Sequence, residues 1–354
     1  MLVATKASAL LPAEELAGLW SPAGPYLNTA SFGLPPRPAF EPLQAALADW
    51  RGGRTSWEGW AEAVEASRAA FARLVGCDAA DVATGATVSE LVGLVAAALP
   101  DGARVVAPSV EFTSNLFPWL AQGSRGVETR TVPLAQLADS VRADTTLVAL
   151  SAVQSSSGEL AELDAVVGAA REHGALVLLD ATQACGWLPL RARDVDFLVC
   201  HGYKWLLSPR GTAYLAVRPE RLAQLTPLHA GWWAGEDPHA SYYGPPLRLA
   251  RSARRLDTSP AWFSWVGAAP ALDLIERIGV EQIHRHNVEL ANRFRAGLGL
   301  DPSNSAIVSV ERPGAAAKLE RAGIRAAVRA GGLRVSFHLY NTPADVDAIL
   351  EALR

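Results

Sequence analysis

Residues 176–183 read LVLLDATQ, an apolar run that ends in one acidic residue, Asp180, and a short polar turn. An uninterrupted apolar run of this kind is typical of a strand that is covered on both faces of a parallel sheet. Similar short runs occur at 104–107, 146–151, 196–200 and 213–217. Helical patterns separate them, and strand–helix alternation over about 130 residues predicts a mostly parallel central sheet with helices on both faces, an α/β fold.

The helical patterns have clear ends, and the composition changes after them. Apolar residues recur at helical spacing over 62–75, 88–99 and 161–172, each followed within two residues by glycine or proline. Residues 231–260 are rich in Trp, Gly and Pro and are expected to form a loop. Beyond them come a long helical pattern and three shorter elements, at 261–298, 306–310, 333–339 and 343–350. We therefore predict a large α/β domain over 22–245 and a small α+β domain made of 1–21 and 246–354.

Composition narrows the class of protein. Half of the 354 residues are hydrophobic and 19% are charged, which supports a large core and excludes a disordered chain. The net charge of −4 predicts no basic surface for nucleic acid or for an anionic membrane. The longest apolar stretch, 91–99, is far shorter than the ~20 residues that cross a bilayer, and the first 20 residues do not resemble a signal peptide. A cytoplasmic location is expected.

Cysteine and histidine give no sign of a metal site. The three cysteines, Cys77, Cys185 and Cys200, are an odd number without CxxC spacing, as expected in a reducing compartment. His284 and His286 are two residues apart on a predicted helix and so point to different sides. We predict no metal ligands.

Lysine is rare in this chain and occurs only at Lys6, Lys204 and Lys318. Lys204 lies in HGYKWLL, residues 201–207, directly after a strand-like run. Apolar and aromatic neighbours disfavour the charged amine and should lower its pKa, and a partly desolvated lysine can form a Schiff base with a carbonyl compound. The alternative is a surface lysine whose aliphatic stem packs against the rings.

Three further polar features fall at the ends of predicted elements, and ligands of open parallel sheets bind beyond the carboxyl ends of the strands. Residues 84–90, TGATVSE, suit either an anion at a helix N-terminus or an N-cap by Thr87 with Glu90. Asp180 needs a cation or a donor at the tip of so apolar a strand, unless it caps the next segment. Arg334 could bind a carboxylate or make a structural ion pair.

Together these features are the parts that pyridoxal 5'-phosphate chemistry requires. The phosphate needs an anion site, the ring nitrogen needs a carboxylate, the aldehyde needs a lysine and an amino-acid substrate needs a cation for its carboxylate. We therefore predict a pyridoxal-phosphate-dependent enzyme that acts at Cα or Cβ of an amino acid, with Lys204 and Asp180 as its catalytic residues.

Three ordered segments are similar to those of the class V aminotransferases: LDATQ at 179–183, GYKWL at 202–206, and 334–342, which begins RVS and ends YNT. These fold-type I pyridoxal phosphate enzymes include cysteine desulfurases, kynureninases and isopenicillin N epimerase. The resemblance runs from about Tyr26 to the C-terminus. It implies the fold-type I architecture and a homodimer with shared active sites.

The resemblance also implies roles at the cofactor ring. Lys204 would hold the cofactor as a Schiff base and move the proton at Cα, and Asp180 would pair with the ring nitrogen. Gln183 would lie near the phenolic oxygen. Phe112 would stack on the ring, which would fix its tilt.

Phosphate and substrate contacts follow from the same resemblance. The phosphate would be bound by Thr87, the Val88 N–H, Ser89, His201 and Tyr203. Ser259, with Thr258 as the alternative, would reach the phosphate of the partner subunit. Arg334, together with Asn28, would bind the substrate, and the guanidinium would hold its α-carboxylate.

The sequence departs from the desulfurases in this family. Their catalytic cysteine lies on a loop shortly before the arginine that matches Arg334, whereas here 328–333 is short and contains no cysteine. Phe112 also stands where desulfurases usually have histidine. We therefore predict an aminotransferase-like enzyme and not a cysteine-nucleophile desulfurase. A C–S or C–C lyase and an epimerase are alternatives, because all these reactions begin with the same Cα carbanion.

Two questions stay open at this point. A non-catalytic relative that uses the fold as a scaffold is a second class of function, which the presence of Lys204 and Asp180 argues against. The aromatic and arginine residues of 231–260 could select the substrate or form a subunit interface.

Overall fold

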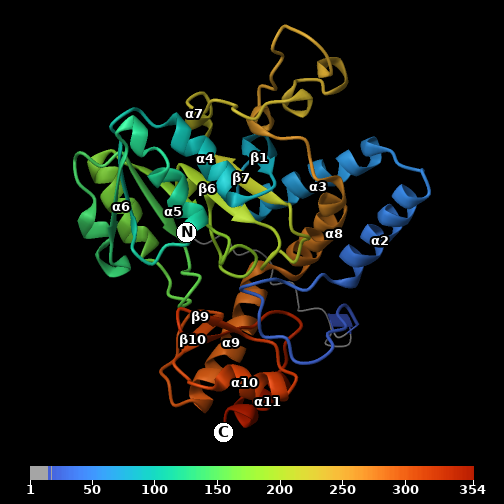
Figure 1. Cartoon of the computed structure of the whole chain (residues 1–354), viewed down its shortest axis with the longest axis vertical. Coiled ribbons are helices and arrows are strands. Elements are labelled where there is room, and N and C mark those ends of the chain that lie inside the picture. Colours follow the sequence, from blue (N-terminus) through green and yellow to red (C-terminus); the bar gives the residue numbers. More distant parts are fainter. Residues whose placement is uncertain (1–14, 17) are drawn as a thin grey trace.

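The computed structural model describes residues 15–16 and 18–354, and a seven-stranded sheet lies at its centre (Figure 1). The strand order is β1-β7-β6-β5-β4-β2-β3. The strands are β1 Val82–Gly85, β2 Arg104–Pro108, β3 Glu128–Val132, β4 Leu147–Ser151, β5 Leu176–Asp180, β6 Phe197–His201 and β7 Ala213–Val217. Neighbours from β3 to β6 are parallel, whereas β7 runs antiparallel to β6 and β1. The predicted mostly parallel α/β sheet is confirmed.

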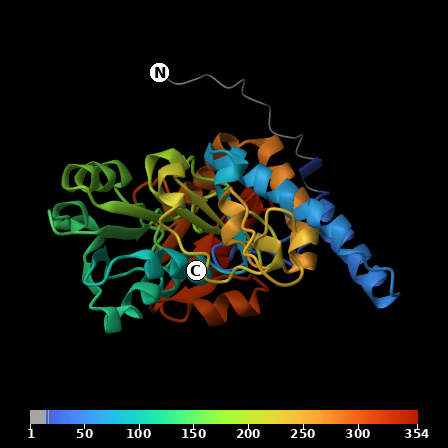
Figure 2. The same cartoon turned by 90° about the horizontal axis from the view of Figure 1, so that it is seen from above.

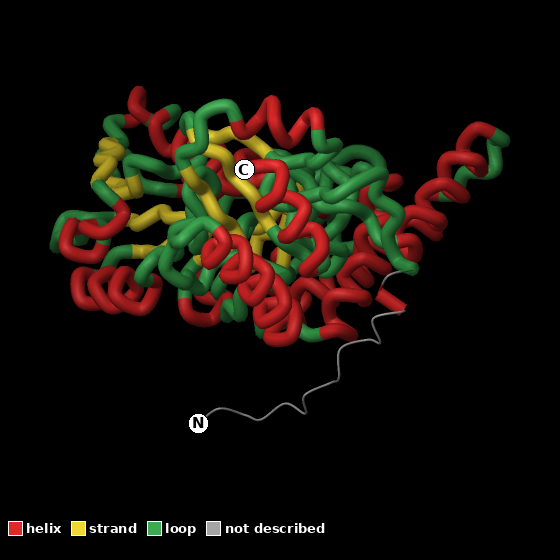
Figure 3. Tube along the Cα trace, turned by 90° about the horizontal axis from the view of Figure 1, so that it is seen from below, coloured by secondary structure: helices red, strands yellow, loops and turns green. Residues whose placement is uncertain are grey.

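Helices cover both faces of this sheet. In β5, Val177 and Leu179 belong to a core with α3, α6 and α8, and Leu178 between them belongs to a second core with α4 and α5. Successive strand side chains point to opposite faces, so a strand that is apolar throughout is buried on both. Figure 3 shows the strands enclosed by helices. These helices are α3 Trp57–Val75, α4 Val88–Ala98, α5 Thr113–Leu120, α6 Leu163–His173 and α8 Trp262–Ile278.

A smaller α+β unit follows at the C-terminal end of the chain, in red at the bottom of Figure 1. Its antiparallel sheet has the order β8-β10-β9, with β8 Ile307–Val310, β9 Ala327–Arg329 and β10 Gly332–Ser336. Helices α9 Val280–Gly297, α10 Ala315–Arg321 and α11 Pro343–Leu353 share a core with it. Residues 26–28 pair with this unit, since Asn28 bridges Ser336 and Leu27 lies in the same core.

The predicted helix over 261–298 is two helices, so that prediction is wrong in one respect. The break is Gly279, whose φ of +90° is a conformation that suits glycine and ends the helical path. Helix α8 packs against α2 (Arg37–Arg51) and α3, within the large core. We therefore propose that the two domains divide near Gly279, and not at 245/246. Residues 1–14 and 17 of the predicted small domain lie outside the described residues.

Two segments project from the body. The α2–α3 hairpin extends sideways in blue in Figure 2, and residues 231–260 form a chain of turns and short 3₁₀ segments at the top of Figure 1, as the sequence predicts. The one-turn helix α7, Pro219–Leu222, precedes that loop. Within residues 15–16 and 18–354, none of the helices has the length and apolar character needed to cross a membrane.

Candidate active site

A cavity opens at the carboxyl ends of the parallel strands, where the sequence places the site. Ser151, Asp180 and His201, the last residues of β4, β5 and β6, all line it. Nine predicted site residues line this one cavity: Thr87, Val88, Ser89, Phe112, Asp180, Gln183, His201, Tyr203 and Lys204. Five other residues that line it were not predicted: Ser114, Ser151, Ser155, Thr182 and Arg210. The fold therefore brings together groups that are more than 100 residues apart in the chain.

One wall of the cavity is the N-terminus of α4. Thr87 is the N-cap and accepts a hydrogen bond from the Glu90 N–H at 3.3 Å, while the Glu90 carboxylate accepts one from the Ala86 N–H at 3.0 Å. The N-cap alternative is therefore correct. It does not exclude an anion site, because the first turn of a helix still presents N–H groups that lack partners within the helix.

Asp180 and Lys204 are both buried in this cavity. Burial raises the pKa of Asp180, and hydrogen bonds from Thr182 oppose that rise; the Thr182 N–H donates to Asp180 Oδ1 at 2.8 Å. Burial lowers the pKa of Lys204 to about 8, although the negative charge of Asp180 opposes the change. The Lys204 Nζ lies 5.3 Å from the ring centre of Phe112 and 5.6 Å from that of Tyr203. The lysine is a buried amine, so the alternative of a surface lysine is wrong.

The backbone around Lys204 is held tightly. The Gly33 N–H donates to the Tyr203 carbonyl at 2.9 Å, and a Cβ at Gly33 would lie 2.0 Å from the Lys204 carbonyl oxygen. Only glycine fits there without moving the chain. Three residues beyond Lys204, Leu207 has a φ of +54°, an uncommon conformation for a branched side chain. Such fixed backbone is suited to holding a reactive side chain in one place.

Trp205 connects this loop to the small domain. Its indole N–H donates to Gln183 Oε1 at 2.8 Å, and its carbonyl is 3.0 Å from His338 Nε2. The Leu339 N–H donates to His338 Nδ1, so this nitrogen carries no proton and Nε2 is the donor to Trp205. Burial lowers the pKa of His338 to about 4, which keeps the ring neutral. His338 was not predicted as a site residue, because nothing in the sequence shows that it meets Trp205.

Arg334 and Gln183 meet at Ser155. Arg334 Nη1 donates to the Ser155 carbonyl and, at 3.2 Å, to its hydroxyl, and the Gln183 amide donates to the same hydroxyl at 3.0 Å. Arg334 is buried, its Nε has no hydrogen-bond partner, and no carboxylate of the described chain forms an ion pair with it. A structural ion pair is thus not what this residue makes. A buried guanidinium without a counter-ion is suited to bind an anion from outside.

Asn28 lies beside this arginine. It bridges Ser336 two residues along β10, and its side-chain oxygen has no partner among the described residues. Ser31, three residues further, accepts a hydrogen bond from Arg334 Nη2 at 2.7 Å. The predicted substrate residues Asn28 and Arg334 are therefore neighbours, although the cavity lining includes neither.

Phe112 is held over the cavity by a buried acid. The Glu111 carboxylate accepts hydrogen bonds from the Phe112 N–H at 2.9 Å and the Ser151 N–H at 2.7 Å, and from the Ser151 hydroxyl. Burial raises the pKa of Glu111, and these bonds oppose the rise. The contacts fix the Phe112 loop to the end of β4, and Phe112 itself is 46% exposed, so its ring face is open to a ligand.

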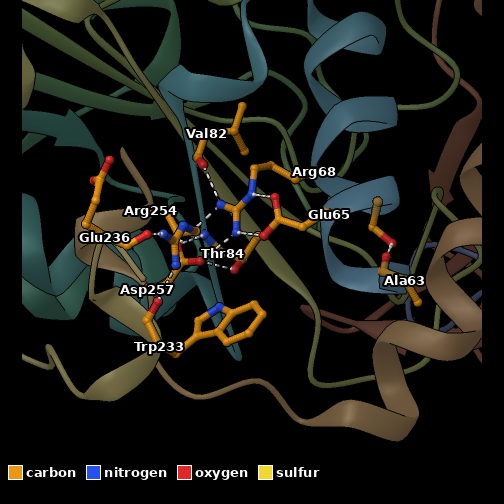
Figure 4. Close-up of polar contacts among 10 residues, drawn as sticks. Ala63, Glu65, Arg68, Val82, Thr84, Trp233, Glu236, Arg254 and Asp257 are labelled. Atoms are coloured by element: carbon orange, nitrogen blue, oxygen red, sulfur yellow. Dashed lines mark hydrogen bonds and ion pairs between the residues drawn. The ribbon is translucent and has the colours of Figure 1, made fainter. Parts of the chain in front are cut away.

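Ser259 is exposed and lies outside the cavity of its own chain. The segment before it is anchored through Asp257, a buried acid that accepts hydrogen bonds from the Thr84 N–H at 2.8 Å, the Thr84 hydroxyl at 2.9 Å and Arg68 Nη2 at 2.6 Å (Figure 4). Thr84 belongs to β1, which leads into the α4 N-terminus. One buried ion pair thus positions both Ser259 and the predicted phosphate site.

The projecting loop is joined to the same cluster. Arg254 donates to the carbonyls of Trp233 and Glu236, both at 2.8 Å (Figure 4). Trp232 and Trp233 pack on Trp57, with ring centres 5.0 and 6.1 Å away. No aromatic residue of 231–260 lines the cavity of the described chain. Within one subunit these aromatic side chains therefore serve packing.

The residues present fit pyridoxal phosphate. Neither ring nitrogen of the buried His201 makes a well-formed hydrogen bond within the described chain, although the ring lines the cavity. A buried polar group without a partner is costly, so a ligand that supplies one is expected. Asp180, the α4 N-terminus and the Lys204 amine would hold the ring nitrogen, the phosphate and the aldehyde carbon of the cofactor. No cluster of metal-ligating side chains occurs among residues 15–16 and 18–354.

Comparisons with known proteins agree with this arrangement. The family model named Aminotransferase class-V matches residues 49–317. The chain is 28% identical over 332 residues to the uncharacterized aminotransferase YcbU of Bacillus subtilis, covering 86% of this chain and 88% of that protein. It is 27% identical over 316 residues to a probable cysteine desulfurase of Methanothermobacter thermautotrophicus, covering 75% and 76%. It is 29% identical over 399 residues to isopenicillin N epimerase of Streptomyces clavuligerus, covering 96% and 97%.

A solved structure shows the same fold. A complex of the cystine C–S lyase C-DES with cysteine persulfide superposes with a TM-score of 0.84, at 22% identity, and the match covers 93% of this chain and 96% of that one. The family model spans more than half of the chain, and the central sheet with the small C-terminal sheet is the fold-type I arrangement. The chain belongs to the class V aminotransferase family, whose cofactor is pyridoxal phosphate.

Proposed function

We propose that this protein is an aminotransferase-like enzyme that acts at Cα of an amino acid with a free α-carboxylate. The observation that carries the proposal is the joint position of Lys204, Asp180 and Arg334. The first two are buried in the cavity, and the third reaches Ser155 on its wall without a counter-ion. Lys204 would supply an amine for the aldehyde, Asp180 a carboxylate for the ring nitrogen, and Arg334 a cation for the substrate carboxylate.

Pyridoxal phosphate, when bound, supplies an electron sink for the carbanion at Cα. The protein's own residues would do the rest. Lys204 Nζ would take the proton from Cα and return it at a later step, because a lowered pKa leaves the amine partly unprotonated near neutral pH. Asp180 would keep a proton on the ring nitrogen by its negative charge. Arg334 would fix the substrate by its carboxylate.

A scaffold without catalysis fits these observations poorly. No hydrogen bond joins the buried Lys204 amine to the described chain, and its nearest ring contacts are those of Phe112 and Tyr203. The amine faces the cavity, and holding a cation in so apolar a setting costs stability. An amine in this setting is expected where a ligand reacts with it.

Two observations support a reaction other than that of a cysteine-nucleophile desulfurase. The turn before Arg334 is a two-residue hairpin, in which Arg329 pairs with Gly332 and both intervening residues, Ala330 and Gly331, have positive φ. Such a turn cannot carry an extended loop over the cavity. None of the cysteines of the described chain lines the cavity, and burial raises the pKa of Cys77 to about 12 and that of Cys200 well above its usual value.

Replacing all three cysteines by alanine should therefore leave the reaction intact. Thiols with raised pKa values are poor nucleophiles, and buried cysteines mostly act as small apolar side chains. Steady-state turnover should stay within about twofold of wild type, with some loss of thermal stability from the cavities left at Cys185 and Cys200. If Cys185→Ala alone removes activity while cofactor and fold are retained, a cysteine nucleophile is at work and the proposal is wrong.

Epimerisation is the second candidate reaction, because the similarity to isopenicillin N epimerase extends over 96% of this chain. To distinguish transamination, epimerisation and elimination, a panel of L- and D-amino acids is added to the purified holoenzyme. Conversion of the cofactor to pyridoxamine phosphate indicates transamination. Loss of substrate optical activity without a keto acid indicates epimerisation, and release of a keto acid with unchanged cofactor indicates elimination.

We propose further that the enzyme is a homodimer with shared active sites in the cytoplasm. Ser259 is exposed and outside its own cavity, and α2 exposes Phe40, Leu47 and Trp50, the last to 60%. Sedimentation should give a mass of twice 37.5 kDa. Ser259→Ala should then weaken cofactor binding without changing that mass. A fully active species that sediments as one chain would contradict this proposal.

A further inference from the structure

The residues predicted for the cofactor phosphate carry no charge of their own. Thr87, Ser89 and Tyr203 are hydroxyl groups, Val88 offers a backbone N–H, and burial lowers the pKa of His201 to about 3, so its ring is neutral. A phosphate monoester carries between about −1.5 and −2 charges at pH 7. The partial charge of a helix N-terminus, about +0.5, offsets only part of this. A fixed cation is missing from the predicted set.

Arg210 lines the same cavity, and no other arginine of the described chain does so. The guanidinium carbon lies 5.0 Å from the ring centre of Tyr203, one of the predicted phosphate residues. His201, the second such residue, lines the same cavity, and the positive charge of Arg210 makes a small contribution to its lowered pKa. No carboxylate of the described chain forms an ion pair with Arg210, so its charge is available to a ligand.

The position of Arg210 is fixed although its side chain is exposed. The Ser264 hydroxyl of α8 donates to the Arg210 carbonyl at 2.7 Å. The next residue, Gly211, has a φ of +101°, and a Cβ there would lie 2.9 Å from the Ser264 hydroxyl oxygen. Helix α8 therefore holds the backbone, and the guanidinium lies over the ring of Tyr203. A cation–π contact leaves guanidinium N–H groups available to oxygen acceptors.

We propose that Arg210 is a cofactor-binding residue that supplies the fixed positive charge for the phosphate of pyridoxal phosphate. This inference rests on the proposed function. Two N–H groups on one edge of a guanidinium match two phosphate oxygens, which makes arginine specific for such groups. The side-chain carboxylate of an acidic amino acid has the same chemistry, so the test must separate the two.

The test compares ligands that differ only in the phosphate. The apo forms of wild type, Arg210→Gln, Arg210→Lys and the control Arg37→Gln are titrated with pyridoxal phosphate and with pyridoxal. Arg37 forms an exposed ion pair with Glu41 at 4.0 Å, outside the cavity. Arg210→Gln should bind pyridoxal phosphate about 10- to 100-fold more weakly, as expected for a lost charge-assisted contact. Binding of pyridoxal should not change, and Arg210→Lys should recover part of the loss.

A second readout follows the phosphate directly. By ³¹P NMR, the bound phosphate of wild type should stay dianionic to lower pH than that of Arg210→Gln, because a neighbouring cation favours the doubly charged form. Equal affinity of wild type and Arg210→Gln for pyridoxal phosphate would overturn the inference. So would a loss confined to KM for acidic amino acids, which would assign Arg210 to the substrate. If wild type itself binds pyridoxal phosphate without attachment at Lys204, it is the proposed function that fails.

Discussion

Lys204→Ala should give a folded protein that borohydride cannot link to its cofactor and whose turnover is lower by about 10²- to 10⁴-fold or more. The variant removes both the amine that reacts with the aldehyde and the group that moves the proton at Cα. Wild type should be yellow and, after borohydride treatment, should carry the adduct on the peptide that contains Lys204. Lys318, whose amine donates to the Leu353 carbonyl at 3.2 Å, lies on α10 outside the cavity and should stay unmodified.

Two controls make this result specific. The thermal stability of the apo variant should not fall much, because the two ring contacts that are lost, at 5.3 and 5.6 Å, are offset by removing the cost of burying the amine. In wild type, the rate of cofactor attachment should rise with pH through about 8 and level off above it, since only the unprotonated amine is a nucleophile. An unperturbed lysine would give a rise near pH 10. An adduct on Lys6 or Lys318 would show that the assignment of Lys204 is wrong.

The parts of the fold that the sequence predicts are those that are buried on both faces. Strands β4, β5, β6 and β7 are apolar runs, and each was predicted to within one residue at either end. Strand β3, Glu128–Val132, was missed because it is an edge strand in which only Val132 is buried and the other four residues are polar. Strand β1, Val82–Gly85, was missed because four residues that include Thr84 and Gly85 give too short an apolar pattern.

The candidate site also contains residues that the sequence predicts and residues that it does not. Residues that act on the cofactor are recognisable from local motifs, since Asp180 ends strand β5 and Lys204 lies three residues after the end of β6. The residues that hold them in place come from remote parts of the chain. Asp257 meets Thr84 across 173 positions, and Arg334 meets Ser155 across 179. No pattern in one sequence signals such pairs, because each is an ordinary polar residue until the fold places its partner.

The electrostatic balance of the cavity follows from this arrangement. Asp180 is the acidic residue that lines the cavity, and Lys204 and Arg210 are the basic residues that line it. Asp180 is buried, and its raised pKa reflects a charge that lacks a strong partner in the protein. A cationic ring nitrogen would supply that partner. The charge of Asp180, more than its shape, is therefore what the reaction should require.

Asp180→Asn tests this point because asparagine keeps the shape and the acceptor for the Thr182 N–H, 2.8 Å away in wild type, and removes only the charge. Turnover should fall by about 10²- to 10⁴-fold, as expected when one member of a buried charge pair is lost. Asp180→Ala should be at least as slow and should keep some cofactor. The apo form of Asp180→Asn should melt no lower than wild type, because it no longer buries a carboxylate. Stopped-flow kinetics measure turnover, and thermal melts measure stability.

Turnover like that of wild type in both variants would remove Asp180 from the mechanism. A large loss in Asp180→Ala with little change in Asp180→Asn would show that the residue acts through its hydrogen bond and not its charge.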